Sequence, residues 1–196
     1  MKVKNQKAFT LAEILIASAL SLIVIIEVIS IYVMLERSWR EGAAQLAVQR
    51  EAQIVLEKIM YGNQVSISGT LYRAGLIEAD EVYTPDIVDS DLPTPDNTIY
   101  FRLIVDNAGK WRSFFLSNGK IYYDPDISIG NNEVIIGPSS SDITATTLEF
   151  RKGDGIGEYG SNSRVGVRVN MQQVISIGTV PLTINATVQS NIRIRN

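Results

Sequence analysis

The 196-residue sequence contains neither cysteine nor histidine. Without cysteine there is no disulfide to cross-link an exported domain and no thiolate nucleophile, so a hydrophobic core has to stabilise the fold. Without histidine there is also no Ser-His-Asp triad and no zinc site of the usual kind. Carboxylates scattered through predicted loops are typical of solvated groups. The composition therefore gives little support to an enzyme.

An excess of basic residues is missing as well. The sequence has 18 Lys and Arg against 21 Asp and Glu, a formal net charge of −3 at pH 7. General binding to nucleic acid needs a basic surface. The charge balance therefore argues against a nucleic-acid partner.

Charge is almost absent from one long apolar run, Phe9 to Leu35, whose only charged residues are Glu13 and Glu27. As a helix, this run is long enough to cross a bilayer core of about 30 Å. A carboxylate in such a helix costs about 2.5–3.5 kcal/mol on insertion scales, so Glu13 should have a partner. Glu27 falls near the outer edge of the hydrocarbon. We interpret it as reaching the interface, with a second intersubunit contact as the alternative.

No proline precedes Pro85, and the first clear helix stop is Gly62. We therefore predict one helix over 9–62, with its transmembrane part over about 9–35. Gly42 is a candidate bend. Helical spacing predicts one buried stripe, formed by Val48, Ala52, Val55, Leu56 and Ile59. A second, roughly opposite stripe could contact neighbouring subunits or be half-buried in the core, and contains Trp39, Ala43, Leu46, Ala47 and Ile54.

After Gly62 the apolar pattern changes from helical to alternating. Residues 78–97 are predicted to form an acidic loop. Alternation over 99–105 and the type I′ turn signal Asn118-Gly119 predict an antiparallel meander. Further strands are expected over 111–116, 121–123, 134–136, 148–150, 165–171 and 182–188. The predicted fold class is α+β, a long N-terminal helix packed on an antiparallel β-sheet.

The residues before the apolar run differ from an ordinary secretory signal. Such a signal has its small-residue cleavage site after the apolar core, whereas here the small residue Ala8 stands before it. Cleavage at Ala8 would remove only a basic leader over 1–8. The apolar helix would stay on the mature protein.

The segment Lys7-Ala8-Phe9-Thr10-Leu11-Ala12-Glu13 resembles the type IV prepilin signal of type IV pilins and of type II secretion and competence pseudopilins. The resemblance implies cleavage between Ala8 and Phe9 by prepilin peptidase and N-methylation of Phe9. It also implies that Glu13 acts in filament assembly by pairing with the N-terminal amine of a neighbouring subunit. One departure is Ala8, since the family usually has glycine there.

The resemblance also implies a location and partners. The leader stays cytoplasmic by the positive-inside rule, so we expect a single-pass inner-membrane protein with an exported β domain over 63–196 in the periplasm or outside the cell. Expected partners are prepilin peptidase, other pilin or pseudopilin subunits, the inner-membrane assembly platform and membrane lipid. The segment from Leu35 to Gly62 is similar to the extended helix of J-type pseudopilins and W-type minor pilins.

We expect no cofactor and no catalytic residue. Calcium is the exception to consider, because hard cations take oxygen ligands from loops. Possible ligands are Asp124 and Asp126, the 86–96 loop, or Asp154 and Glu158. None of these has EF-hand spacing, and no site is assigned.

Two functions remain open. The first is a structural subunit, a minor pilin or pseudopilin of a type IV pilus or a type II secretion-like filament. The second is a membrane-anchored exported binding module that recognises a substrate or surface without polymerising. An uncleaved single-span anchor would fit the second function.

Overall fold

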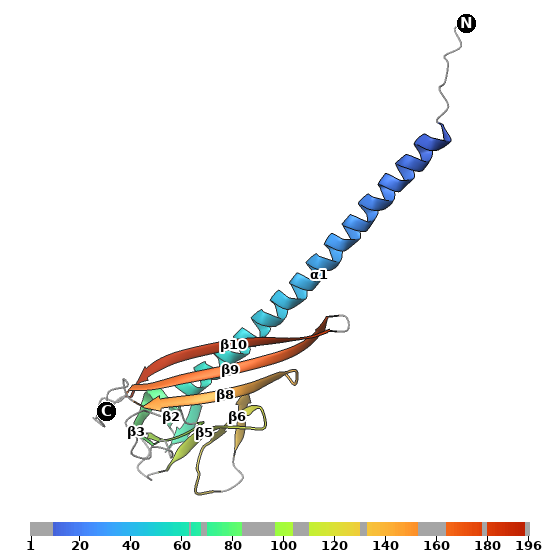
Figure 1. Cartoon of the computed structure of the whole chain (residues 1–196). Helices are drawn as coiled ribbons and strands as arrows, with labels where there is room; N and C mark the ends of the chain where they lie inside the picture. Colours follow the sequence, from blue (N-terminus) through green and yellow to red (C-terminus); the bar gives the residue numbers. More distant parts are fainter. Residues whose placement is uncertain are drawn as a thin grey trace, which may run out of the picture. The chain divides into compact units, whose positions relative to one another are not determined.

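Figure 1 shows a computed structural model of the chain. The structure describes residues 10–62, 64–67, 70–83, 97–103, 110–129, 133–152, 164–177 and 180–194. The elements, in chain order, are α1 (Leu11–Tyr61), β1 (Gln64–Ile67), β2 (Thr70–Arg73), η1 (Leu76–Glu78), β3 (Ala79–Tyr83), β4 (Thr98–Leu103), β5 (Arg112–Ser117), β6 (Lys120–Asp124), β7 (Val134–Gly137), β8 (Ile143–Lys152), β9 (Arg164–Ile177) and β10 (Val180–Arg193).

The chain divides into two compact units, 1–43 and 44–196, and each is described by itself. The first contains the N-terminal part of α1. The second contains the rest of α1 and every described strand. A long N-terminal helix followed by antiparallel strands confirms the predicted α+β class. The predicted helix range, 9–62, begins at a residue outside the described ones.

The described strands form three antiparallel sheets rather than the single sheet that the sequence suggested. Five strands follow one another in the order β3-β4-β5-β6-β7. The central strands of this sheet, β4, β5 and β6, are the predicted meander, and β3 and β7 extend it on the two sides. Three longer strands form a separate sheet in the order β10-β9-β8, and β1 pairs with β2. Residues Asn118 and Gly119 have positive φ of 48° and 72° between β5 and β6. Positive φ at both positions confirms the predicted type I′ turn.

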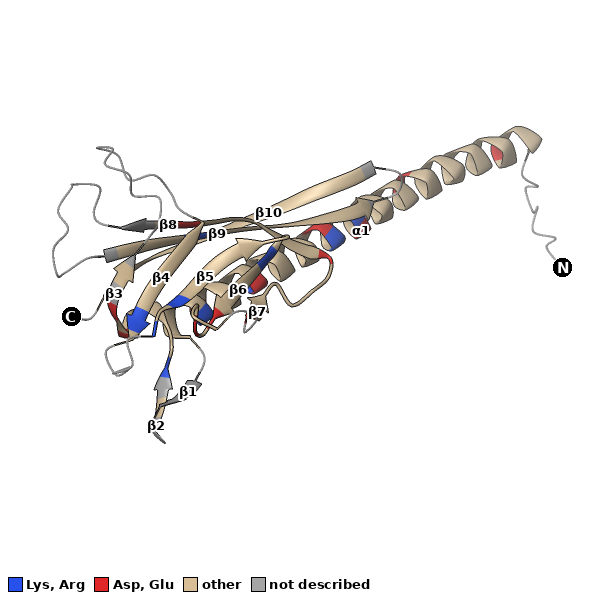
Figure 2. Cartoon of the chain, turned by 90° about the horizontal axis from the view of Figure 1, so that it is seen from below, with Lys and Arg blue, Asp and Glu red and all other residues tan. Residues whose placement is uncertain are grey.

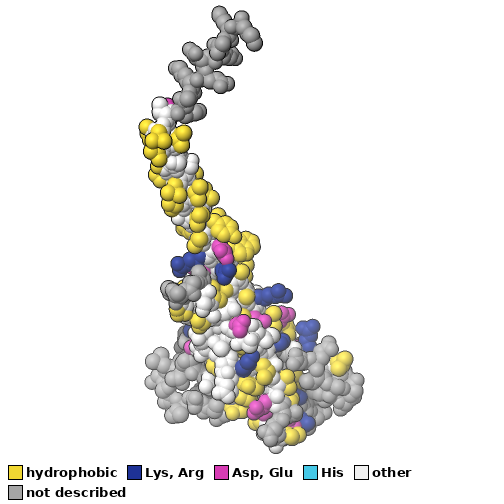
Figure 3. Space-filling model, turned by 90° about the vertical axis from the view of Figure 1, so that its right-hand side faces the viewer, with side chains coloured by type: hydrophobic (Ala, Val, Ile, Leu, Met, Phe, Trp, Pro, Cys, Tyr) yellow, Lys and Arg dark blue, Asp and Glu magenta, His cyan; other side chains and the backbone are white. Residues whose placement is uncertain are grey.

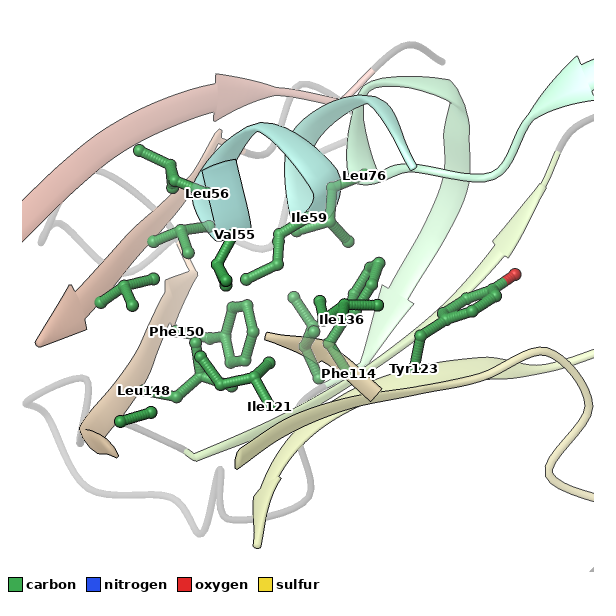
Figure 4. Packing of buried hydrophobic residues seen from close by; sticks show 14 of the residues in the cluster. Val55, Leu56, Ile59, Leu76, Phe114, Ile121, Tyr123, Ile136, Leu148 and Phe150 are labelled. Atoms are coloured by element: carbon green, nitrogen blue, oxygen red, sulfur yellow. The ribbon is translucent and has the colours of Figure 1, made fainter. Parts of the chain in front are cut away.

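The core lies between the C-terminal part of α1 and the two larger sheets (Figure 4). All five residues of the predicted helical stripe are buried, together with Ala44. Val55 and Ile59 point from α1 toward the aromatic and aliphatic side chains of the sheets (Figure 4). Those side chains include Phe114, Ile121 and Phe150, all at most 1% exposed.

Strand β3 lies where a loop was predicted, and β8, β9 and β10 are several residues longer than predicted. A β-bulge accompanies two of these differences. The first is in β3, within the predicted acidic loop, where a register shift lies between Ala79 and Glu81. The shift puts Ala79 and Val82 on the buried side although they are three residues apart. In β8 a shift between Ala145 and Thr147 has the same effect, so this strand is longer than predicted. A bulge changes the phase of the side chains, which hides the strict alternation that marks a strand.

Helix α1 ends at a glycine with a left-handed backbone. Gly62 has φ of +66°, and its N–H donates to the carbonyl of Lys58 at 2.7 Å. This is the usual bond of a helix that stops at a left-handed residue. A Cβ at Gly62 would overlap the backbone of Ala74, and one at Gly75 would overlap that of Tyr61. The chain after β2 therefore packs backbone to backbone on the end of the helix.

Polar side chains of α1 form hydrogen bonds with backbone groups at the β7 edge of the five-stranded sheet. The ammonium of Lys58 donates to the carbonyl of Ile136 at 2.8 Å, and Glu51 accepts from the N–H of Ser139 at 3.0 Å. Gly137 lies between these two contacts, and an added Cβ would overlap Val55. The helix thus bonds to backbone groups of an edge strand that could otherwise pair with another chain.

Candidate functional site

The first turn of α1 holds the Glu13 carboxylate in a capping box. Oε2 of Glu13 accepts from the N–H of Thr10 at 2.8 Å and from its hydroxyl at 3.0 Å. In return, the N–H of Glu13 donates to the Thr10 hydroxyl at 3.3 Å. The pattern is Thr-x-x-Glu with Thr10 as N-cap, and it satisfies donors that the helix start would leave free.

The capping box provides the Glu13 carboxylate with a hydrogen-bond partner inside the chain. A carboxylate in an apolar helix needs a partner, and within this chain Thr10 supplies two hydrogen bonds to Glu13. The carboxylate therefore lies at the start of the helix, the end that attracts negative charge. Thr10 directly follows Phe9 in the sequence. The predicted cleavage site, Ala8 and Phe9, lies outside the described residues.

The role of Thr10 was missed in the sequence analysis, although a signal for it was present. A threonine three residues before a glutamate, at the start of an apolar run, is the sequence pattern of a capping box. The prepilin resemblance directed attention to the carboxylate alone. The same four residues carry both patterns.

The N-terminal unit presents a continuous apolar surface from Leu11 to Leu35, and nearly all its large side chains are more than half exposed. Few charged residues interrupt this part of α1 (Figure 2). Its serine hydroxyls bond to the helix itself: Ser18, Ser21 and Ser30 donate to carbonyls three or four residues earlier, at 2.8–2.9 Å. Among the described residues, α1 is the one helix long and apolar enough to cross a membrane.

Four residues of the second predicted stripe of α1, Trp39, Ala43, Leu46 and Ala47, are exposed, and the fifth, Ile54, is half-buried. Trp39 is 80% exposed and Leu46 is 69% exposed. Between the apolar run and Gly42, two ion pairs at helical spacing join Arg37 to Glu41 and Arg40 to Glu36. The outer part of the helix therefore carries aromatic, apolar and neutralised charged groups on its surface.

The Asp124 and Asp126 pair serves the local fold. Asp124 accepts from the N–H of Asp126 at 2.9 Å, and Asp126 accepts from the hydroxyl and the N–H of Ser128 at 2.6 and 3.1 Å. The second oxygen of Asp126 pairs with Lys110 at 3.3 Å. The bond from the Ser128 hydroxyl is the main cause that lowers the pKa of Asp126. No group of three His, Cys, Asp or Glu suited to a metal occurs within the described ranges. The other two calcium candidates, 86–96 and 154 with 158, lie outside them.

Comparison with known families gives one match. The family model of the prokaryotic N-terminal methylation motif matches residues 3–26. No curated protein and no solved structure matches the chain. Together with the long apolar helix, the matched motif is a type IV pilin-like prepilin signal. The motif and the helix suit a membrane-anchored pilin.

Proposed function

We propose that this chain is a minor pilin or pseudopilin, a structural subunit of a type IV pilus or a type II secretion-like filament. The observation that carries the proposal is the methylation motif over 3–26, which overlaps the exposed apolar part of α1 from Leu11 to Leu35. A helix of this composition inserts in a membrane and can later pack against like helices in a filament.

In this proposal the chain is inserted in the inner membrane by a single helix, with residues 63–196 exported. Prepilin peptidase cuts between Ala8 and Phe9 and the new amine of Phe9 is methylated. Other pilin or pseudopilin subunits and the inner-membrane assembly platform are the partners. No cofactor and no catalytic residue takes part.

Glu13 is the assembly residue in this proposal. Its Oε2 accepts a hydrogen bond from the N–H of Thr10, the residue that follows Phe9. A carboxylate at this place suits pairing with the N-terminal amine of a neighbouring subunit. An ion pair shielded by apolar helices is sensitive to change, since losing one partner of a buried pair costs about 3–5 kcal/mol. The J-type and W-type subclass resemblance remains part of the proposal.

The test is the intact mass and N-terminal sequence of the protein purified from membranes, with and without prepilin peptidase. We expect a peptidase-dependent chain that starts at methylated Phe9. An Ala8→Gly variant, which restores the usual residue, should be processed at least as fast. A chain that keeps residues 1–8 with the peptidase present would favour the alternative function, an anchored exported binding module.

A further inference from the structure

Two aromatic side chains at the outer end of the apolar surface have high exposure. Tyr32 is 67% and Trp39 is 80% exposed. They are seven residues apart, which is close to two helical turns, so both lie on one face of α1. In Figure 3, hydrophobic side chains cover most of the helix between an acidic side chain at its start and the next charged side chains along it.

The charged residues between and beyond these aromatics neutralise one another. Arg37 pairs with Glu41 through Nε at 2.8 Å, and Arg40 pairs with Glu36. The two arginine side chains are about 60% exposed, and the two glutamate side chains are 37% and 45% exposed. This short segment is therefore polar but carries no net charge. A surface of that kind suits the zwitterionic headgroup layer of a bilayer and does not require anionic lipid.

The length of the helix places the outer edge of the hydrocarbon core close to Tyr32. From Leu11 to Tyr32 the axis rises roughly 32 Å at 1.5 Å per residue. A tilt of about 20° brings this to about 30 Å, the thickness of the hydrocarbon core. Ending the span at Leu35 instead would require a stronger tilt. Tyr32 therefore falls at the hydrocarbon edge.

Trp39 then falls in the layer of headgroups. Its Cα is roughly 10 Å further along the axis than that of Tyr32. Long side chains of a helix lean toward its N-terminus and cover the preceding turn, which moves the indole back by about 5 Å. The headgroup layer is about 5–7 Å deep on each side. Aromatic rings with a polar edge are enriched there.

We propose that Tyr32, at the hydrocarbon edge, and Trp39, in the headgroup layer, form an aromatic anchor at the outer boundary of the membrane and so set the depth of α1. The inference rests on the membrane anchoring in the proposed function and does not depend on filament assembly. One consequence concerns Glu27, five residues before Tyr32. Its carboxylate then lies about 7 Å inside the hydrocarbon edge rather than at the interface.

The chain itself provides a spectroscopic probe, because Trp39 and Trp111 are its two tryptophans. A Trp111→Phe variant of the full-length chain leaves Trp39 as the sole tryptophan. It is reconstituted in phosphatidylcholine vesicles whose lipids are brominated either near the glycerol or near the end of the acyl chain. We expect the shallow bromine to quench Trp39 more than the deep bromine does. Adding anionic lipid should leave that ratio unchanged.

Two control variants separate the aromatic anchor from membrane insertion itself. In a chain with both Trp39→Phe and Trp111→Phe, Leu22→Trp places the probe near the middle of the span, and deep bromine should quench it more. The single Trp39→Phe variant reports Trp111, which should escape quenching by either lipid.

The remaining outcomes overturn the inference in different ways. Quenching of the Leu22 probe without quenching of Trp39 means that the helix is inserted but Trp39 lies outside the lipid, free to contact a partner helix. Stronger quenching of Trp39 by deep bromine means that the boundary lies further along α1. Absence of quenching at both probes overturns the membrane anchor and the aromatic anchor together.

Discussion

Glycine residues in this chain have contrasting environments, and the contrast gives a prediction at the residue scale. Gly62 has φ of +66° and would place a Cβ on the backbone of Ala74. Gly42 lies inside α1, where an added Cβ would meet nothing within 4 Å. Glycine is therefore required at the end of the helix and dispensable in its interior.

We expect Gly62→Ala and Gly42→Ala to change stability in opposite directions. The left-handed conformation costs alanine about 1–2 kcal/mol, and the overlap with Ala74 adds to that loss. Alanine at Gly42 should instead raise helix stability by up to about 1 kcal/mol. Chemical unfolding of the full-length chain in detergent measures both. Equal changes in unfolding free energy for the two variants would contradict this difference between Gly62 and Gly42.

The contacts of Asp126 predict how the stability of the unit formed by residues 44–196 responds to acid. The Ser128 hydroxyl, the larger cause, and Lys110 lower the pKa of Asp126 below its ordinary value of 3.8. A carboxylate with a lowered folded-state pKa stabilises the fold above its unfolded pKa. It loses that contribution as the pH falls through the folded-state pKa. The contribution should therefore be full above about pH 5 and decline below about pH 4.

The measurement is the unfolding free energy against pH for wild type, Asp126→Asn and Ser128→Ala. Wild type should lose more stability on acidification than Asp126→Asn does. Ser128→Ala should fall between them, because it removes the main cause of the lowered pKa and keeps Lys110. Three parallel curves would show that this turn does not contribute to acid sensitivity.

At the scale of elements, the sequence predicted those helices and strands whose buried side chains recur at a regular helical or strand spacing. The buried stripe of α1, the 99–103 part of β4 and the Asn118-Gly119 turn were all predicted correctly, since each follows from a regular period or a required backbone conformation. Strands β3 and β8 were misjudged because a bulge shifts their phase. The division into separate sheets depends on contacts far apart in sequence, which no local pattern records.

One of the polar contacts between α1 and β7 is made by a lysine whose role was not predicted from the sequence. Lys58 donates to the carbonyl of Ile136 at 2.8 Å in a partly buried place. Lys58→Met keeps the aliphatic length and removes the donor, so we expect a loss of about 1–2 kcal/mol in unfolding free energy. Arg50→Met, at an exposed position of the same helix, is the matched control and should have little effect. Urea unfolding in detergent compares them, and equal losses would mean that the contact contributes nothing.

At the scale of the whole molecule, the candidate site was predictable because it is linear. The methylation motif and the apolar run overlap in one continuous stretch of sequence, so no long-range folding is needed to recognise them. Residues 63–196 gave no comparable signal of their own, because the residue pattern of a half-buried sheet reflects the core rather than a binding surface.

The last prediction separates the two roles open to Glu13, capping the helix and pairing with another subunit. Glutamine can serve in a capping box as glutamate does, but it has no charge to pair with an amine. Glu13→Gln should therefore insert in the membrane with α1 intact and yet fail to assemble. A loss of about 3 kcal/mol per contact corresponds to a more than hundredfold weaker association.

The measurement is the fraction of the chain found in sheared filaments relative to the membrane fraction, after processing has been checked by mass. Glu13→Leu, which removes cap and charge together, should be at least as defective. Glu27→Gln controls for the loss of any carboxylate in the apolar helix and should remain closer to wild type, because Glu27 is remote from the N-terminus that cleavage exposes. Normal assembly of Glu13→Gln would leave capping as the sole role of the carboxylate and make the anchored binding module the better account of this chain.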